Sequence, residues 1–497
     1  MDRKKFIKLS SSATVFTLFG GIGWLLEGCK KTAMNMAKSI AVNSGNFDNP
    51  LRLLPILNGS SPINFTAKQI TTTIIKGKTT KALGYTDDIL APIIKVNNGQ
   101  TVSINFTNQL EEKTNIHWHG LIIPENMDGH PQYTVKQGSA FNYQFAINQK
   151  AGTNWFHPHP HLTTGKQVNK GLAGMFIIND TEETALNLPS GEFELPLIIQ
   201  DKRIYSDGSI NYSPEGTDVM SGYFGQYICV NGSWSAFHNI KTKIYRIRLL
   251  NGSNARVYNL SFSNGAAFNI IGSDGGLLGT TQVASSLILS PGERADVLVD
   301  FSTVSVGTEI YLQNNSFSGG DSQGTESFKI MKFKVTEQLT ETFSIPTSLV
   351  VFNPIPTSQS IKTRSFEIAN NHAGGHGGMN MGSSSSIHKI GGKSFDMDRI
   401  DETVTAGTTE IWEFDNSAGA DLHPMHLHGV HFQVVSRIGG RGIILPHETG
   451  WKDTVLCMPS EKVKVIMTFP TNLGKFAFHC HNLEHEDSGM MLNYKII

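Results

Sequence analysis

The sequence predicts an all-β protein with three β-sandwich domains in series. The chain has 497 residues, and at about 150 residues per domain this length predicts about three domains. From about residue 50 onward, short alternating strands are separated by turns rich in glycine and asparagine. Long helical periodicity is scarce, so we expect strands rather than helices to form the cores.

The composition indicates a folded protein without a preference for polyanions. Apolar residues make up 39% of the chain and 49 residues are glycine, which excludes disorder of the whole chain. The 41 basic and 42 acidic residues leave a net charge of −1, so no long-range field attracts nucleic acid or an anionic membrane. The four cysteines lack C-x-x-C spacing and are too few to hold the fold together as disulfides.

Residues 1–29 are predicted to be an export signal. Several basic residues precede an apolar run over residues 13–26, which is too short to span a bilayer comfortably and is typical of a signal peptide. Residues 3–8 resemble the bacterial twin-arginine export motif, with lysine in place of one arginine. This resemblance implies export to the bacterial periplasm or cell envelope as a folded protein.

The end of this signal resembles a bacterial lipobox. In residues 26–29 the motif would place an acylated cysteine at Cys29, and a lipid there would be the only contact with a membrane. Residues 30–49 would then form a loose tether. The alternative is that Cys29 is an ordinary thiol in a discarded leader.

Alternating strands continue through the rest of the chain. Residues 92–106 have the pattern of two strands joined by an Asn-Asn-Gly turn, which predicts a hairpin. Residues 463–469 carry apolar side chains at every second position, which predicts a strand with one buried face. We place the domain boundaries in the polar stretch 180–190 and in the proline-spaced stretch 345–356. The predicted domains are residues 50–185, 186–345 and 346–497.

One segment of the third domain, residues 372–388, has almost no apolar side chains to bury. Its glycines and serines predict a flexible stretch. Thioether and imidazole groups suit Cu(I), so the segment is a candidate for Cu(I) capture, and the alternative is a plain surface loop. The residues concerned are His372, His376, Met379, Met381 and His388.

Four short His-x-His segments carry the chemistry. In an extended strand, residues i and i+2 point to the same side, so each segment presents two imidazoles together. One such pair is weak evidence, but four pairs with further histidines, a cysteine and a methionine nearby are hard to obtain by accident. The pairs are His117 and His119, His157 and His159, His426 and His428, and His479 and His481.

Cys480 lies inside the last pair and faces the opposite way from its two histidine neighbours. On that side it can meet His485 and Met490, with His423 from the preceding cluster. Two histidines, one cysteine and a weak axial methionine predict a blue-copper electron-transfer site rather than a zinc site. The alternative, a buried cysteine acting as a small apolar residue, does not explain the flanking histidines.

The eight paired histidines fit a cluster of three coppers shared between the first and last domains. Cys480 would then connect this cluster to the blue-copper site. Two distant parts of the sequence must meet in space for this to happen, which favours the first domain docking on the third.

At these residues the chain resembles the multicopper oxidases, a family that includes laccases, bilirubin oxidases and bacterial copper-efflux oxidases. The likeness runs from about residue 50 to the C-terminus. It is greatest to the periplasmic cuprous oxidases, with laccases next, at residues 395–397, 450–455 and 483–491. The family fold implied is three cupredoxin domains, each a Greek-key β-sandwich.

The resemblance implies four copper ions. The type 1 copper would be held by His423, Cys480, His485 and Met490. The type 2 copper would be held by His117 and His426. The type 3 pair would be held by His119, His157, His159, His428, His479 and His481.

Two acidic residues match family acids that deliver protons to the oxygen-reducing cluster. These are Asp128, in a turn after the first histidine pair, and Glu486, next to His485. Without the resemblance they would be interpreted as a turn-forming aspartate and a solvated glutamate. His161 has no counterpart with a role in the family.

O2 needs four electrons to become water, whereas the expected reductants supply one at a time. The first hypothesis is an exported cuprous oxidase for copper tolerance, motivated by the His- and Met-containing segment 372–388, and Asp421 supplies the acid that such enzymes place before the first type 1 histidine. Such enzymes also place a methionine just upstream of that histidine, and residues 420–422 offer none. The second hypothesis is a laccase-like oxidase of phenols and aromatic amines, and the third is a non-enzymatic copper-binding protein.

Overall fold

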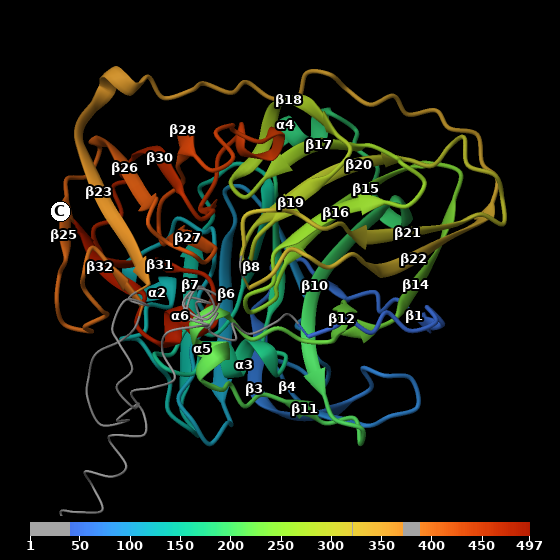
Figure 1. Cartoon of the computed structure of the whole chain (residues 1–497), viewed down its shortest axis with the longest axis horizontal. Coiled ribbons are helices and arrows are strands. Elements are labelled where there is room, and N and C mark those ends of the chain that lie inside the picture. Colours follow the sequence, from blue (N-terminus) through green and yellow to red (C-terminus); the bar gives the residue numbers. More distant parts are fainter. Residues whose placement is uncertain (1–39, 321, 371–387) are drawn as a thin grey trace, which may run out of the picture. The chain divides into compact units, whose positions relative to one another are not determined.

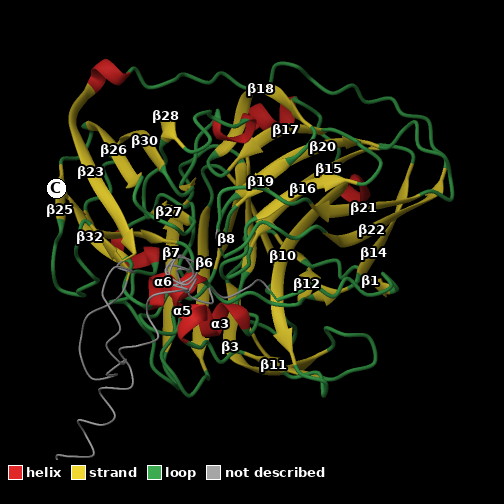
Figure 2. Cartoon of the chain, in the orientation of Figure 1, coloured by secondary structure: helices red, strands yellow, loops and turns green. Residues whose placement is uncertain are grey.

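The computed structural model describes residues 40–320, 322–370 and 388–497. Within these ranges strands dominate and the helices are short, as predicted (Figure 2). None of those helices has the length and apolarity needed to cross a membrane. The predicted export signal and the first part of the tether lie outside the described residues, as does all of segment 372–388 except His388.

The first sandwich packs two four-stranded sheets around a core of its own. Its strands are β2 Ile56–Leu57, β3 Ile63–Thr72, β4 Thr80–Gly84, β5 Ile93–Asn97, β6 Thr101–Asn108, β7 Ala140–Ala146, β8 Gly152–Phe156 and β9 Gly174–Asn179. The sheet orders are β4-β3-β6-β7 and β2-β5-β9-β8.

The prediction of a hairpin over residues 92–106 is wrong. Both strands form, but β5 pairs with β2 and β9, whereas β6 pairs with β3 and β7. The turn between them carries the chain from one sheet of the sandwich to the other. Each strand thereby packs apolar side chains into the same core from opposite sides.

The second sandwich has a six-stranded and an eight-stranded sheet. Its strands are β1 Asn49–Pro50, β10 Glu194–Ile204, β11 Ile210–Asn211, β12 Tyr227–Val230, β13 Ser233–Trp234, β14 Ala236–Lys241, β15 Ile244–Asn251, β16 Tyr258–Phe262, β17 Phe268–Ser273, β18 Gly276–Ala284, β19 Leu287–Leu289, β20 Arg294–Asp300, β21 Glu309–Asn314 and β22 Phe328–Glu337. Strand β1, at the end of the predicted tether, pairs with β14. The end of that stretch therefore lies along the second sandwich.

The third sandwich consists of two five-stranded sheets. Its strands are β23 Ser360–Asn370, β24 His388–Ile390, β25 Glu402–Val404, β26 Thr409–Asn416, β27 His423–Leu427, β28 Gln433–Gly439, β29 Thr454–Cys457, β30 Glu461–Thr468, β31 Gly474–Cys480 and β32 Met491–Ile496. The predicted strand over residues 463–469 is β30, and its predicted face is buried. Ile466 is buried as well, so the opposite face is partly covered.

Short helices occupy the connections between strands. They are α2 Glu125–Asp128, α3 Thr164–Asn169, α4 Thr181–Ala185, α5 Gly216–Ser221 and α6 Leu483–Asp487, with 3-10 turns η1 Gly191–Phe193, η2 Thr357–Gln359 and η3 Pro446–Glu448. Helix α6, from the third sandwich, lies against α5 from the second and α3 from the first (Figure 1). All three sandwiches therefore contribute to the region around β31.

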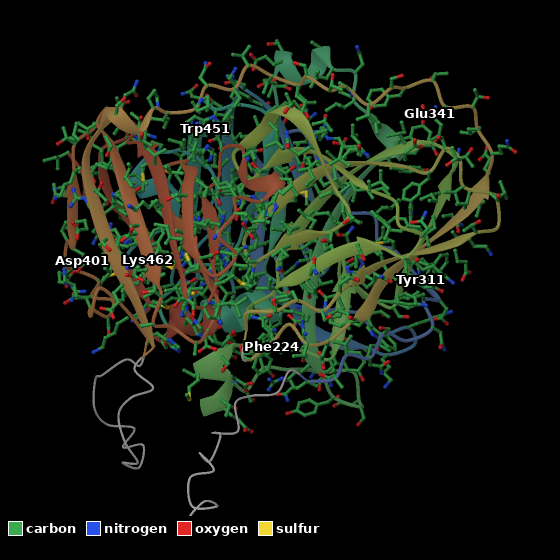
Figure 3. All side chains as sticks on the ribbon, turned by 45° about the horizontal axis from the view of Figure 1, so that its top comes forward. Phe224, Tyr311, Glu341, Asp401, Trp451 and Lys462 are labelled. Carbon is green, nitrogen blue, oxygen red and sulfur yellow. The ribbon has the colours of Figure 1, made fainter. Side chains whose placement is uncertain are left out.

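The second sandwich also joins the other two directly. Thr153 Oγ1 of β8 donates a hydrogen bond to Asp296 Oδ1 of β20 at 2.6 Å. The carbonyl of Trp451, in the third sandwich, accepts from Gly275 N at 2.8 Å and from Ser273 Oγ at 2.9 Å (Figure 3). These hydrogen bonds help to fix the relative positions of the strands that carry the histidines.

Candidate metal centre

The structure places the eight paired histidines in one buried group. His117 and His157 face each other across a two-residue bridge in the first sandwich, where their backbone N–H groups donate to each other's carbonyls at 2.8 and 3.1 Å. In the third sandwich, β27 pairs with β31 so that His426 lies opposite His479. Every one of the eight is at most 1% exposed.

The two ends of the chain meet at this group. His117 Nε2 lies 3.4 Å from His426 Nε2, and His159 Nε2 lies 3.2 Å from His479 Nε2. The rings of His117 and His428 stack with centroids 3.7 Å apart. The cluster is therefore built jointly by the first and third sandwiches.

The tautomers of these rings leave nitrogen lone pairs directed at one another. His117 and His426 each donate from Nδ1 to a backbone carbonyl, at 2.7 and 2.8 Å, so Nε2 is the unprotonated nitrogen in both. His428 donates from Nδ1 to Asp128 and His479 to its neighbour's carbonyl, yet their Nε2 atoms lie 3.1 Å apart. Facing lone pairs repel unless a cation lies between them, so the donor set fits bound metal ions.

Further nitrogens in the cluster have no hydrogen-bond partner among the described residues. They are His119 Nδ1, His157 Nε2, His159 Nδ1 and both ring nitrogens of His481. Leaving buried polar atoms without a partner costs free energy, and metal coordination would satisfy them. Burial lowers the pKa of these rings, which keeps them in the neutral form that binds metal.

The second group is centred on Cys480, at the end of β31. Its Sγ lies 3.5 Å from His423 Nδ1 and 3.7 Å from His485 Nδ1, and those two nitrogens are 3.3 Å apart. Met490 is fully buried in the same core, and its carbonyl accepts from Cys480 N at 3.0 Å. Burial raises the pKa of the Cys480 thiol well above its usual value, so a cation is needed to hold it as a thiolate.

Cys480 joins the two groups through the backbone. Its side chain belongs to the second group, while its neighbours His479 and His481 point into the cluster of eight. His479 Nδ1 also donates to the Cys480 carbonyl at 3.0 Å. A short path of covalent and hydrogen bonds therefore connects the sulfur to the cluster.

Asp128 is buried at the end of α2 and contacts two of the histidines. Its Oδ2 accepts from His428 Nδ1 at 2.7 Å, and its backbone carbonyl accepts from His117 Nδ1 at 2.7 Å. Gly129 follows in the left-handed region, with φ +87°, and a Cβ there would lie 2.2 Å from the carbonyl oxygen of Ile116. The glycine therefore allows the turn to approach the histidine strand.

Glu486 lies on α6 at the other side of the cluster and is also buried. Its carboxyl oxygens lie 3.6 Å from His159 Nδ1 and 3.3 Å from His479 Nδ1. Burial, with the nearby Asp487, raises the pKa of Glu486 well above its usual value. The interpretation of Glu486 as a solvated surface residue is therefore wrong.

Two residues that the sequence pattern does not reveal, Asp453 and Arg294, hold the cluster in place. Asp453 accepts from His119 Nε2 at 2.9 Å through Oδ1, and its carbonyl accepts from His426 Nδ1. Arg294, from the second sandwich, pairs with the same carboxylate at 2.7 and 2.6 Å. Burial alone would raise the pKa of Asp453, but Arg294 and His119 outweigh it and hold the pKa well below its usual value. Asp453 lies in the family-like stretch 450–455, whereas no local signal marks Arg294.

The described residues proposed for Cu(I) capture are both buried. Asp421 is 1% exposed, and its carbonyl accepts from Asn416 Nδ2 at 2.9 Å. His388 is fully buried, and its ring stacks on His485 with centroids 3.9 Å apart. His161 is half-buried against Phe395. The remaining capture candidates, His372, His376, Met379 and Met381, lie outside the described residues.

Comparison with known proteins agrees with this site. Three multicopper oxidase family models match residues 66–183, 152–331 and 366–497. Multicopper oxidase mco of Staphylococcus epidermidis is 34% identical over 445 residues, which is 88% of this chain and 89% of that protein. The laccase of Bacillus subtilis is 31% identical over 469 residues, covering 83% and 89% respectively.

Solved structures agree in fold. McoA multicopper oxidase from Aquifex aeolicus superposes with a TM-score of 0.82 at 36% identity, covering 90% of this chain and 99% of that one. A Campylobacter jejuni multicopper oxidase, described as a metallo-oxidase, superposes with a TM-score of 0.80 at 30% identity, covering 93% and 98%. The predicted fold class of three cupredoxin-like sandwiches is confirmed. The chain belongs to the multicopper oxidases and is a copper-dependent oxidoreductase that uses O2 as its electron acceptor.

Proposed function

We propose that this protein is an exported cuprous oxidase, which takes electrons one at a time from Cu(I) and reduces O2 to water. It would carry four coppers. His423, Cys480, His485 and Met490 would hold the type 1 copper, His117 and His426 the type 2 copper, and His119, His157, His159, His428, His479 and His481 the type 3 pair. When bound, these ions would supply the one-electron redox chemistry of the reaction.

The chain's own residues would hold the metal ions, connect the two metal sites and supply protons. Cys480 connects the site of electron entry with the cluster, because its backbone continues directly into His479 and His481. Asp128 and Glu486 lie on opposite sides of the cluster and hold or donate protons close to where O2 is reduced. Burial of all the ligands excludes bulk water, which limits escape of partly reduced oxygen.

The proposal that Cu(I) is the reductant rests on the way in which α5 covers His485. This residue is fully buried, and its Nε2 lies 3.0 Å from the carbonyl of Met220 in α5. Electron transfer slows steeply with distance, so an aromatic donor reacts fastest close to a ligand of the copper, and α5 covers the edge of His485 that such a donor would approach. A small ion needs no such cleft.

A laccase-like oxidase of phenols and aromatic amines is the second candidate. Relatives named laccase support it, as does the lack of a methionine in residues 420–422, just upstream of His423. Asp421 in this stretch is buried, so it would reach a substrate ion only through a movement of the surrounding loops.

Oxygen uptake with Cu(I) and with a phenol separates the two candidates. We expect the full-length, copper-loaded protein to consume O2 faster with Cu(I). Replacing His372, His376, Met379 and Met381 together by serine should raise KM for Cu(I) about tenfold and leave phenol oxidation unchanged, since only binding of the ion is lost. Faster turnover of the phenol by the unaltered protein would favour the laccase, and an unchanged KM for Cu(I) would remove the capture role of the segment.

Export and lipid attachment are part of the same proposal. They are supported by the basic and apolar pattern of residues 1–29 and by the cysteine at position 29. Mass spectrometry of the protein from its native membrane fraction should show a mature chain that begins at Cys29 and carries a lipid. An unlipidated chain that begins elsewhere would contradict the anchor.

Glu486→Gln tests the proton supply. Gln keeps the shape of the side chain but carries no transferable acid proton, so O2-driven reoxidation of the reduced enzyme should slow about 10²-fold. Anaerobic bleaching of the thiolate-to-copper band should remain unchanged. The matched control is Glu484→Gln on the same helix, because Glu484 bonds Asn254 and Tyr212 rather than a histidine. Equal slowing in both variants would point to a local structural effect instead.

A further inference from the structure

Helix α5 of the second sandwich holds two imidazoles of the third. His485 Nε2 lies 3.0 Å from the Met220 carbonyl, and His388 Nε2 lies 2.8 Å from the Val219 carbonyl. These are consecutive carbonyls in the last turn of α5, where backbone oxygens have no partner within the helix. Two neighbouring histidines therefore donate hydrogen bonds to backbone carbonyls at the C-terminal end of α5.

This arrangement fixes which nitrogen of His485 can bind a metal. A carbonyl only accepts hydrogen bonds, so the bond to Met220 places the proton on Nε2. Nδ1 is then unprotonated and faces His423 Nδ1 at 3.3 Å and Cys480 Sγ at 3.7 Å. The Asn482 amide nitrogen lies 3.1 Å from the same Nε2, but it also donates to the Ser221 carbonyl, which leaves the Met220 bond in place.

The His388 ring covers one face of His485. The two centroids lie 3.9 Å apart, with 23° between the planes, and both side chains are fully buried. His388 therefore occupies the space from which water would otherwise reach a ligand of the type 1 site. Access of water to a metal site controls its local dielectric and its reduction potential.

Helix α5 is itself firmly anchored. Arg203 pairs with Asp218 of α5 at 3.0 and 2.5 Å, and its guanidinium stacks over the Tyr223 ring at 3.8 Å. The same arginine donates to the carbonyl of Phe224, which Figure 3 labels beside α5. The carbonyls that orient the two imidazoles are thus held by the body of the second sandwich.

We propose that His388 is a positioning residue of the type 1 site, whose stacked ring excludes water from His485 and thereby raises the reduction potential of the copper held there. Reduction of a cupric ion bound to a thiolate lowers the net charge of the site, and a drier site favours the less charged state. The inference rests on the proposed copper site at His423, Cys480 and His485. The expected effect of His388 on the potential is the same whichever reductant supplies the electron.

The test is a redox titration of the copper-loaded protein, followed at the thiolate-to-copper band. His388→Phe keeps a flat ring without the N–H donor, His388→Gln keeps a donor without the ring, and His388→Ala removes both. We expect H388F to retain the native potential. H388Q and H388A should both lower the one-electron equilibrium constant about tenfold, equivalent to about 59 mV. The control is His238→Ala, a half-buried histidine in the second sandwich.

Two ringless variants keep the test decisive if one of them does not fold. A native potential in either folded ringless variant would overturn the proposal, and so would an equal decrease in H388F. Failure of the underlying copper site looks different, because the unaltered protein would then show no thiolate-to-copper band at all. A preference for phenols over Cu(I) would leave the inference intact.

Discussion

Cys480→Ser is expected to abolish oxidation of every reductant while the cluster of eight histidines keeps its copper. Serine removes the thiolate that would hold the proposed type 1 copper, so electrons could no longer enter the backbone path to His479 and His481. Turnover should fall at least about 10³-fold, equivalent to about 4 kcal/mol in activation free energy. The intense thiolate-to-copper band should disappear while the spin-resonance signal of an ordinary cupric ion remains.

The matched control is Cys229→Ser, since Cys229 is also a buried free cysteine but lies in the second sandwich. It should keep the absorption band and the activity, with some loss of stability from burying a hydroxyl group. If C480S retained substantial turnover, electrons would have to reach the cluster by another path, and the proposed role of the sulfur would fail.

Asp453→Asn is expected to have the largest effect on stability. The aspartate neutralises Arg294, which is fully buried, and also accepts from His119. Without the carboxylate, a guanidinium from the second sandwich is left buried and poorly compensated, at a cost of about 3–5 kcal/mol in the free energy of unfolding. Copper affinity should also fall, about 10–100-fold, because His119 loses the partner that orients it.

Chemical denaturation and copper titration of the apo-protein would measure the two effects. Asp415→Asn is the control, because Asp415 pairs at 2.6 Å with Lys462, a partly exposed lysine of the third sandwich that Figure 3 labels. A surface pair of this kind contributes little, so its removal should leave both measurements nearly unchanged. Similar free energies of unfolding and similar copper affinities for D453N and D415N would show that the pair of Asp453 and Arg294 does not stabilise the site.

Local spacing was enough to find the histidines. Alternation along a strand is set by backbone geometry alone, so His479 and His481 could be assigned to one side and Cys480 to the other before any tertiary structure was considered. The same kind of local reasoning gave a wrong prediction at residues 92–106, where the expected hairpin does not form. A turn motif predicts that the chain reverses, but it does not say which sheet the second strand joins.

The residues that sequence reasoning missed act through contacts between sandwiches. Arg294 meets Asp453 only because the second and third sandwiches dock, and neither residue lies near the other in the chain. His388 was interpreted as part of a capture segment because of its neighbours in the sequence. Its stacking on His485 depends on the strand pairing of β24 and on the position of α5, which periodicity does not encode.

The division of the cluster between β-strands of the first and third sandwiches has a consequence for biosynthesis. Half of the imidazoles are in place once the N-terminal third of the chain has been made, and the other half emerge only with the last part of the polypeptide. A nascent or truncated chain therefore offers copper an incomplete set of ligands, and it lacks Cys480, the residue that connects the two metal sites. The complete set of ligands exists only after synthesis is finished and the two ends have docked, so four-electron reduction of O2 would begin only then.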